Sequence, residues 1–416
     1  MNPSHYISRR LRLRSSGTGS GVGVLIAVAG VAIAVMVMEF TLAVVVGFKD
    51  GIRDKLTGFD AQITVEAPID AATGEQERYY RSDAVVEATV RSHFPDADLR
   101  LSLRQPGLLK TDDNFQGVVF LGQSPDADFA FERSNIVEGQ WPDYAADSTE
   151  NMIVLSRPVA RMLGLGVGDR VFSTFIIDEA VKLRRHTVAA LYESNFGEYD
   201  QTVVYASLRG LQRVAGLDSL EANRLDIRGI APDGIADEAA ALQMELIDRV
   251  ARGELPQHYP VDNIEHTGAM YFTWLALLDT NVVVIFILML AVSGLTLVSS
   301  LFILILERVP MIGVLRAMGA SKSMVRGIFV DLAMRLVGIG MIIGNVLGIG
   351  LLLVQKFTGL IPLDPAMYYL ASVPVEIRPW AFVALNAGVV LAAWLILVLP
   401  ARLASGIDPA KAMNYD

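Results

Sequence analysis

Few residues of this chain have the types and spacing that a chemical site requires. The sequence has 416 residues and no cysteine, and its histidines are far apart. They are His5, His93, His186, His258 and His266. Neither an H-E-x-x-H nor a C-x-x-C spacing occurs, although zinc sites usually bring ligands together through such short spacings. We therefore expect no metal site. Disulfides are excluded, which is compatible with an oxidising compartment but does not indicate one.

Motifs for a hydrolase or a nucleotide site are also missing from the sequence. It contains no G-x-S-x-G nucleophile elbow and no G-x-x-x-x-G-K-[ST] phosphate loop. The run GLGVGD at 164–169 lacks the G-x-G-x-x-G spacing of a dinucleotide loop, so we interpret it as a turn. We expect that the chain is not an enzyme and binds no cofactor, and that any ATP it uses is hydrolysed by a partner.

Charged residues inside long apolar runs are the remaining chemical candidates. Asp331 and Arg335 are four residues apart in one such run, and a neutralising pair at that spacing needs no further role. Glu39 lies alone in another run. Two interpretations of Glu39 stay open: an acid that faces a seam between helices or the wet end of a tilted helix, and an acid with a direct role in gating.

The charged residues Glu39, Asp331 and Arg335 lie within long apolar segments. Four such segments are long and apolar enough to cross a membrane. Hydrophobic residues make up 52% of the chain and the mean hydropathy is +0.42, whereas a spanning helix needs about 20 apolar residues. The segments are 22–46, 275–306 with its apolar run from Val282 to Leu306, 328–354 and 380–400. The first is too long for a signal peptide and is predicted to be retained. The sequence predicts an integral membrane protein with four transmembrane α-helices.

Basic residues in the short loops predict which side of the membrane each loop occupies, because they mark the cytoplasmic face. They are Arg9, Arg10, Arg12 and Arg14 before the first segment, and Arg308, Arg316, Lys322 and Arg326 between the second and third. Both ends are therefore predicted to be cytoplasmic. The resulting parts are an N-terminal segment 1–21, an extracytoplasmic domain 47–274, a cytoplasmic loop 307–327, an outer loop 355–379 and a tail 401–416.

The segment 47–274 predicts one large mixed α/β extracytoplasmic domain between the first and second helices. Alternating apolar residues predict strands at 62–66, 117–122 and 152–155, and within HTVAALY and QTVVYASL. Helices are predicted at 82–94 with Ser82 as N-cap, from Pro158, and within DGIADEAAALQMELIDRVAR. The domain carries 22 Lys plus Arg against 37 Asp plus Glu, a net charge of −15. Nucleic acid is therefore not an expected partner.

The loop sequence ERVPMIGVLRAMGASKSM, residues 307–324, predicts a short amphipathic helix between the second and third spans. An apolar stripe at spacings of three and four residues lies on one face of that helix. Its members are Met311, Val314, Leu315 and Met318. Pro310 suits a first helical turn, Gly319 a left-handed C-terminal position and Ser321 the cap of the next helix.

This loop helix resembles the coupling helix of permeases in the superfamily that contains MacB, FtsX and the lipoprotein-releasing proteins LolC and LolE. The ending LPARLASGIDPAKAM is similar to the ending of that superfamily, with Pro400, Arg402, Asp408 and Pro409 matching. The runs GFKDGIRDKLTGFDAQITV and FGEYDQTVVYASLRGLQRVAGL resemble the lipoprotein-releasing branch. Met311 stands where an acidic residue often occurs, and no carrier-binding hook can be matched.

The resemblance implies a transport subunit that extracts lipoproteins from the outer leaflet of the bacterial inner membrane, with its large domain in the periplasm. Implied partners are a LolD-like ABC ATPase dimer that binds ATP and Mg, a second permease copy or homologue, a LolA-like periplasmic carrier and membrane lipids. The ATPase would contact the loop through Glu307, Arg308, Met311, Ile312, Leu315, Arg316, Met318 and Gly319. An FtsX-like signalling transmitter and a MacB-like efflux permease are the alternatives.

Candidate residues for a lipid or cargo cavity lie at the outer ends of the predicted spans. They are Phe40, Val44 and Phe48 in the first span, Leu278 and Val282 in the second, and Leu360, Ile361 and Tyr368 in the outer loop. Apolar side chains at that depth could receive acyl chains, and each could equally face lipid or pack between spans.

Overall fold

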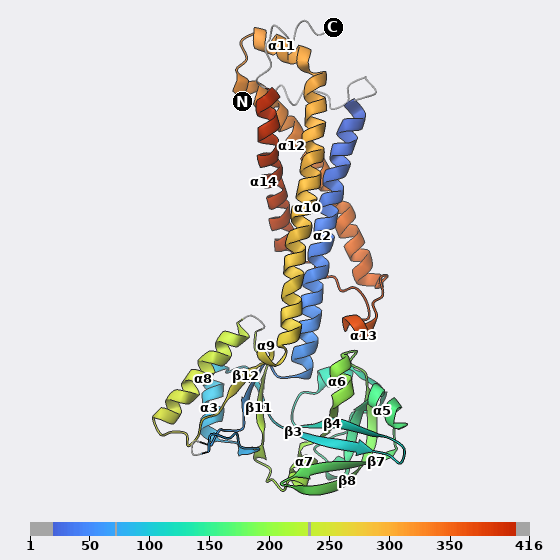
Figure 1. Cartoon of the computed structure of the whole chain (residues 1–416), viewed down its shortest axis with the longest axis vertical. Helices are drawn as coiled ribbons and strands as arrows, with labels where there is room; N and C mark the ends of the chain where they lie inside the picture. The colour runs from blue at the N-terminus through green and yellow to red at the C-terminus, as the bar shows by residue number, and fades with distance from the viewer. Residues whose placement is uncertain (1–19, 71–72, 232–233, 405–416) are drawn as a thin grey trace. The chain divides into compact units, whose positions relative to one another are not determined.

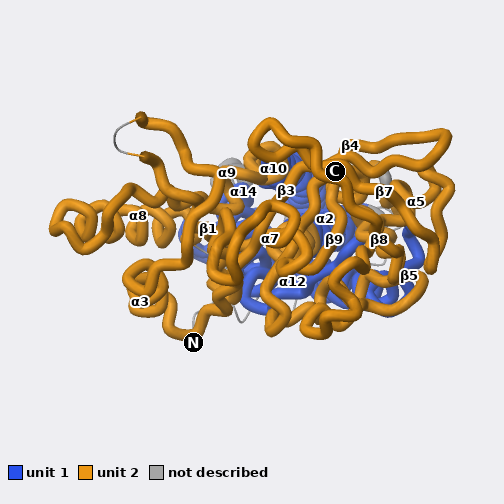
Figure 2. The backbone as a smooth tube through the Cα atoms, turned by 90° about the horizontal axis from the view of Figure 1, so that it is seen from below, with its two compact units in different colours: residues 1–50, 274–362, 372–416 blue, residues 51–273, 363–371 orange. Residues whose placement is uncertain are grey.

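The computed structural model describes residues 20–70, 73–231 and 234–404, which form two compact units. Figure 2 colours them separately. One unit takes in residues up to 50, 274–362 and residues from 372 onward, and the other takes in 51–273 and 363–371. The basic residues Arg9, Arg10, Arg12 and Arg14, and the motif residues Asp408 and Pro409, lie outside the described residues.

Four described helices are long and apolar enough to cross a membrane, which confirms the predicted four spans, and most of their residues belong to the first unit. They are α2 (Ser20–Phe59), α10 (Ala269–Glu307), α12 (Lys322–Thr358) and α14 (Pro379–Ala404). Each begins before or ends after its predicted segment, because polar turns at the ends continue the helix beyond the apolar run. In Figure 1 the short helix α11 (Val309–Ala317) lies crosswise at one end of this unit.

Glycines on α12 allow α2 to pack against it closely. A Cβ added at Gly340 would lie 2.7 Å from the Cβ of Val31, and one added at Gly344 would lie 2.7 Å from the carbonyl oxygen of Ala32. Glycines four residues apart let membrane helices approach to backbone contact. Residues of all four spans then complete one apolar core, among them Val35, Leu297 and Phe329.

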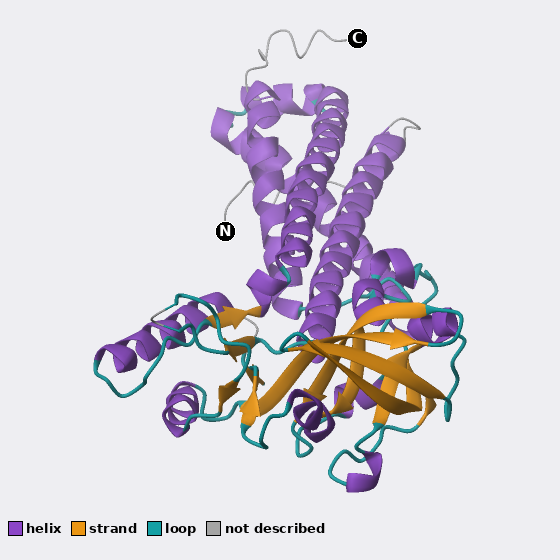
Figure 3. Ribbon diagram, turned by 60° about the horizontal axis from the view of Figure 1, so that its bottom comes forward, coloured by secondary structure: helices purple, strands orange, loops and turns teal. Residues whose placement is uncertain are grey.

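The second unit is a mixed α/β domain, as predicted, with a curved sheet that Figure 3 shows in orange. Its strands are β1 (Ile63–Glu66), β2 (Tyr80–Arg81), β3 (Asp98–Lys110), β4 (Phe115–Gln123), β5 (Ile136–Gly139), β6 (Met152–Ser156), β7 (Arg170–Ile177), β8 (Ala180–Tyr192), β9 (Val203–Ser207), β10 (Glu221–Ala222), β11 (Arg224–Arg228) and β12 (Val261–Asn263). Its helices are α3 (Ala84–His93), α4 (Ala130–Ser134), α5 (Arg157–Leu163), α6 (Gly197–Thr202), α7 (Leu208–Ala215), α8 (Ile235–Ala251), α9 (Ile264–Thr267) and α13 (Pro365–Tyr368).

Strands β3, β4, β9, β6, β8 and β7 close into a ring, because β7 pairs with both β8 and β3. The pairs β4 with β9 and β6 with β8 are parallel. The interior of the ring holds a core of fully buried side chains that includes Leu103, Phe120 and Phe175. Beyond β3, the sheet continues through β11 and β1 to β12.

The longest strand that was not predicted from the sequence is β3. It pairs with β4 at 102–110, and its other edge pairs with β11 at 98–102 and with β7 at 108–110. Pro106, which cannot donate a backbone hydrogen bond, falls in the gap between those partners. The side chain of Asn223 fills part of the gap, since it accepts from the backbone N–H of Arg104 and donates to its carbonyl.

The structure confirms two of the predicted helix end signals around the loop after α11. Ser321 caps α12, and Gly319 has the left-handed conformation, with φ 94°, that was predicted after α11. The prediction of Ser82 as the cap of α3 is wrong by one residue. The Asp83 side chain accepts from the backbone N–H of Val85, whereas the Ser82 hydroxyl donates to Glu87.

The predicted topology can be tested with single cysteines, because the chain has none of its own. Met244→Cys places a thiol at a position that is 67% exposed on α8, and Met318→Cys places one at a 72% exposed position after α11. In intact cells with a permeabilised outer membrane, an impermeant maleimide should label position 244 and not position 318. Labelling of position 318 under those conditions would contradict four crossings with a periplasmic second unit.

Candidate functional site

The helix α11 presents apolar side chains outward on the loop between α10 and α12. Val314 is 53% exposed and Met318 is 72% exposed, while Ile312 is only 1% exposed and belongs to the apolar core of the spans. Met311 packs against the same core. The predicted stripe is therefore divided: one side fixes α11 to the membrane helices, and the other side is exposed.

The joint between α11 and α12 has hydrogen bonds that make it stiff. At the C-terminal end of α11, Gly319 has φ 94°. The N–H of Gly319 donates to the carbonyl of Arg316 and the N–H of Ala320 donates to that of Leu315, which is the Schellman arrangement. Ser321 follows directly, and its hydroxyl accepts from the N–H of Met324 at the start of α12. A displacement of α11 can therefore be transmitted to α12, because hydrogen bonds hold the short connection between the two helices.

The remaining residues predicted to contact an ATPase lie around this face. Glu307 and Gly319 are exposed, and Arg308, Leu315 and Arg316 are half-buried. Ile312 differs from them, because its burial leaves it no surface for a partner. It positions the helix instead.

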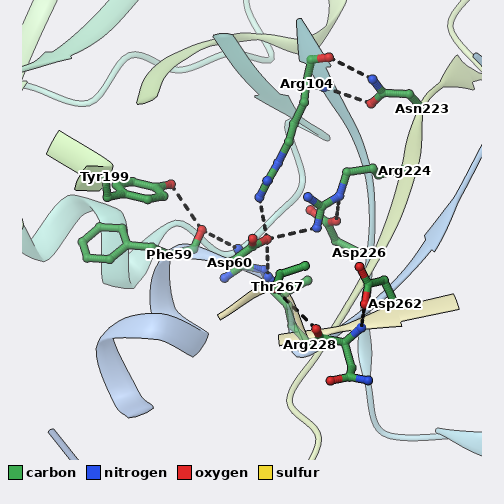
Figure 4. A network of polar contacts seen from close by, with 12 residues as sticks. Phe59, Asp60, Arg104, Tyr199, Asn223, Arg224, Asp226, Arg228, Asp262 and Thr267 are labelled. Carbon is green, nitrogen blue, oxygen red and sulfur yellow. Dashed lines mark hydrogen bonds and ion pairs between the residues drawn. The ribbon is translucent and has the colours of Figure 1, made fainter. Parts of the chain in front are cut away.

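A second polar site lies at the C-terminal end of α2, within the second unit. Figure 4 shows Asp60 between two arginines. Its Oδ1 lies 2.6 Å from Nη2 of Arg104 on β3 and 3.0 Å from Nη2 of Arg224 on β11. The same oxygen accepts from the backbone N–H of Ala61 at 2.8 Å. Asp226 holds the other side of the Arg224 guanidinium, with 3.0 Å from Oδ1 to Nε.

The last carbonyls of α2 are bound by side chains from the same sheet and from α6. Arg228 donates through Nη1 to the carbonyl of Gly58 at 3.0 Å, and the hydroxyl of Tyr199 donates to that of Phe59 at 3.2 Å. A cation at a helix C-terminus is favourable because the helix dipole is negative there. Lys55, one turn earlier, donates to the carbonyls of Ser194 and Tyr369, each at 2.7 Å.

We call the network of Asp60, Arg104, Arg224, Arg228 and Tyr199 the Asp60 anchor. Electrostatic interactions stabilise it. Burial of Asp60 opposes its negative charge, but Arg224 and Arg104 outweigh that effect and hold the pKa of the carboxyl well below its ordinary value. Burial of Tyr199 raises the pKa of its hydroxyl, which therefore remains a hydrogen-bond donor. The network is a set of ion pairs and hydrogen bonds that fixes one end of a helix.

A cavity of about 290 Å³ lies beside the anchor in the second unit. Aromatic side chains of Phe59, Phe196, Tyr199 and Tyr271 line much of it, and Asp60 and Arg104 form a polar wall. The rings of Phe196, Tyr271 and Tyr369 also pack against one another, with centroids 4.8 to 5.7 Å apart.

The structure brings only some of the predicted cargo residues together. Phe40 and Val44 pack, partly buried, against a small core that contains Leu352 and Phe382. Phe48 meets the ring of Trp274 edge to face, with centroids 6.5 Å apart. Leu278 and Val282 are half-buried, and Leu360 and Ile361 are exposed. Tyr368, 38% exposed, belongs to the second unit, unlike the other seven.

Sequence reasoning missed the Asp60 anchor, although two signals for it were present. Asp60 lies in the run at 47–65 and Tyr199 lies in the Glu-Tyr-Asp segment, and both runs resemble the lipoprotein-releasing branch. Nothing in the spacing indicates that Asp60, Arg104 and Arg224, up to 164 positions apart, share one ion pair network. Only the pairing of β3 with β11 brings the two arginines side by side.

Removing the central carboxylate should destabilise the second unit. Asp60→Ala leaves two guanidinium groups without their shared partner. The three side chains are 10% to 33% exposed, so we expect a cost of about 2 kcal/mol, below that of a fully buried pair. Arg78→Ala is the control, because it breaks the exposed pair of Arg78 with Asp178, 55% and 78% exposed, where little change is expected. The free energy of unfolding of the detergent-purified protein measures both.

The difference in the free energy of unfolding between wild type and Asp60→Ala should decrease in acid. Because the folded state depresses the pKa of Asp60, its stabilisation is complete above the unfolded value of about 3.9 and is lost as the pH falls below it. The gap between wild type and Asp60→Ala should therefore be constant near neutral pH and shrink in acid. A gap that stays equal to that of Arg78→Ala at every pH would contradict the anchor.

The sequence matches two protein-family models. The model described as MacB-like periplasmic core domain matches residues 24–247, more than half of the chain, and the model described as FtsX-like permease C-terminal matches residues 283–409. Together they cover both units.

Curated relatives and solved structures are similar as well. The lipoprotein-releasing system transmembrane protein LolC of Xylella fastidiosa (strain 9a5c) is 24% identical over 397 residues, 90% of each chain. LolC of Neisseria meningitidis serogroup B is 26% identical over 281 residues, 64% of this chain and 65% of the relative. The extracellular domain of the transporter YknZ from Gram-positive bacteria matches with a TM-score of 0.34 and 12% identity, over 49% of this chain and 100% of that structure. The periplasmic region of MacB from Actinobacillus actinomycetemcomitans gives 0.32 and 10%, over 50% and 91%.

The family models account for the order of the parts: one membrane helix, a periplasmic core domain and a C-terminal permease region with three further helices. The resemblance seen in the loop helix and in the juncture after the first span is thereby confirmed. The chain belongs to the MacB- and FtsX-like permeases, as a multi-pass inner-membrane protein with a periplasmic core domain that is similar to LolC along nine-tenths of its length.

Proposed function

We propose that this chain is the permease subunit of an ABC transporter that extracts lipoproteins from the outer leaflet of the inner membrane and passes them to a periplasmic carrier. The observation that carries the proposal is α11: a helix with Val314 and Met318 exposed on one side and Ile312 buried in the core on the other. Similarity to proteins named for lipoprotein release supports the choice of cargo.

The proposed partner at α11 is a dimeric cytosolic ABC ATPase, which would bind the ATP and Mg. Closure of the ATPase dimer would push on the exposed side of α11. The Schellman end and the Ser321 cap would then carry the movement into α12, and the buried side into the core of the spans. This coupling requires no catalytic residue in the permease.

The energetics of the cargo explain why a membrane cavity is needed. Each buried CH₂ of a lipid anchor contributes about 0.8 kcal/mol, so two or three acyl chains are held by tens of kcal/mol. Release into water would be prohibitive. A workable path leads from the bilayer to an apolar cavity between this permease and a second copy or homologue, and then to an apolar cavity in the carrier.

We place the entry to this path at the outer ends of the first and second spans. Phe48 and Trp274 pack edge to face there, and Leu278 and Val282 follow on α10. Partly buried side chains at such a position can exchange a neighbouring helix for an acyl chain at small cost, since both contacts are apolar.

A charge on the exposed side of α11 should uncouple the ATPase. Met318→Lys leaves the helix intact, because a cation is favourable at its C-terminal end, but it would bury an ammonium group in the partner's pocket. A desolvation cost of about 3 kcal/mol corresponds to a loss of about a hundredfold in affinity. Copurification of the ATPase and its stimulation by the permease measure the effect.

The matched control for this variant is Met244→Lys, which introduces the same charge at a methionine of similar exposure in the periplasmic unit. It should leave ATPase binding unchanged. Equal binding by wild type, Met318→Lys and Met244→Lys would remove α11 from the coupling role.

The cargo path can be tested by photo-crosslinking. A photoreactive amino acid at Phe48 should capture a lipoprotein, whereas one at Ile342, which is 67% exposed on α12, should capture lipid only. Crosslinks at position 48 should form without nucleotide, since transfer from bilayer to apolar cavity needs little energy. They should weaken when a non-hydrolysable ATP analogue closes the ATPase.

The same experiment separates this proposal from its alternatives. Equal lipoprotein capture at positions 48 and 342, or none at either, would favour a signalling transmitter that moves no lipid. Capture of a secreted peptide at position 48 would favour efflux.

A further inference from the structure

Glu39 is an acid buried in the middle of the first membrane helix. Its side chain is 0% exposed, and neither carboxyl oxygen has a hydrogen-bond partner of normal geometry among the described residues. It therefore lies in a seam between helices, and the interpretation as the wet end of a tilted helix does not hold. A buried polar group in this state needs a physical explanation.

The position facing Glu39 on α12 is Gly348, the third glycine of the series that begins with Gly340 and Gly344. A Cβ added at Gly348 would come within 2.4 Å of Oε2 of Glu39. The carboxyl group therefore occupies the space that a side chain would otherwise fill. The side chain of Asn386 on α14 lies next to the carboxyl group, so three helices meet at this point.

The neighbouring amides have no N–H left to donate to a carboxylate. Asn386 donates through Nδ2 to Oδ1 of Asn345 at 3.0 Å and to the carbonyl of Phe382 at 2.9 Å. Asn345 donates through Nδ2 to Oδ1 of Asn386 at 2.8 Å and to the carbonyl of Met341 at 2.7 Å. An amide NH₂ has two donors, and both are used in each residue. Only lone pairs on the amide oxygens remain.

No charged side chain among the described residues near Glu39 neutralises it. On α12 the nearest charged residue to Gly348 is Lys356, eight positions away, and it pairs with Glu376. On α2 the nearest is Lys49, ten positions from Glu39, and it pairs with Asp279. Arg378, eight positions before Asn386, pairs with Asp50. Eight residues of helix span about 12 Å, so none of these charges reaches the carboxyl group.

An ionised carboxylate in such a place would cost many kcal/mol, and a group so placed takes up a proton instead. The neutral acid also solves the hydrogen-bond problem, because its O–H can donate to a remaining lone pair of an amide oxygen. We propose that Glu39 is a proton-binding site in the membrane-spanning unit, where the neutral acid joins α2 to the Asn345–Asn386 pair and closes the glycine seam.

The proton in this site depends on the closed seam. If α2 moves away from α12, water reaches the carboxyl group and the proton leaves to it, so that a charged Glu39 opposes reclosure until a proton returns. Separation of the two helices would therefore be accompanied by release of one proton per permease. This property does not depend on the identity of the cargo.

Infrared spectroscopy of the purified full-length protein tests the site directly. The difference spectrum between wild type and Glu39→Gln should contain the carbonyl-stretch band of a protonated carboxylic acid. The band should persist from about pH 6 to about pH 8, where an exposed glutamate with an ordinary pKa near 4.3 is ionised. A difference spectrum that contains only carboxylate bands would overturn the proposal.

Two glycine variants on α12 provide a matched pair that keeps Glu39 itself. Gly348→Ala should push the carboxyl group out of its space and shift or abolish the band. Gly350→Ala should leave the band unchanged, since a Cβ there meets nothing within 4 Å. Identical bands in both variants would show that the acid does not occupy the seam. These measurements involve neither ATPase nor lipoprotein, so their failure would leave the proposed transport function untouched.

Discussion

The end of α2 is the point on which the periplasmic unit depends, because a helix that leaves its last carbonyls buried must find donors for them. Here the donors are Arg228 and Tyr199, and the ion pairs of Asp60 hold the sheet strands that carry or flank them. Strands β3 and β11 are adjacent in the sheet because of their backbone pairing. Through the anchor, the register of β3 and β11 therefore fixes the position of the C-terminal end of α2.

In the loop between α10 and α12, the backbone groups at the helix ends are satisfied by neighbouring residues. α11 ends in a Schellman arrangement and α12 begins at a serine cap, so the few residues between them have their backbone groups satisfied within the turn. No distant residue is required. This difference explains why α11 could be predicted in detail and the Asp60 anchor could not. Capping patterns involve residues that are neighbours in the sequence, whereas ion pairs between strands join residues that are far apart in it.

The same distinction between local and distant interactions decides what could be predicted in the rest of the chain and what could not. Membrane helices follow from apolar runs, and the pair of Asp331 with Arg335, 2.9 Å apart, follows from helical spacing. Strand β3 was missed because Pro106 and Gly107 look like a break, although the proline sits where the edge lacks a partner strand and Gly107 makes room for Phe120 and Phe175. The burial of Glu39 against Gly348 depends on how α2 and α12 pack, and periodicity within one helix carries no information about its neighbour.

The closed ring of strands bears on how the domain survives in the periplasm. An unpaired strand edge is a template onto which another chain can add a strand, and proteins that lack disulfides have fewer means of holding such edges shut. In the described residues, each strand of the ring has neighbours on both sides, and the one gap along β3 combines a proline with the side chain of Asn223. The outermost strands β5 and β12 are only four and three residues long. Resistance to aggregation is therefore a property of the strand topology of the domain.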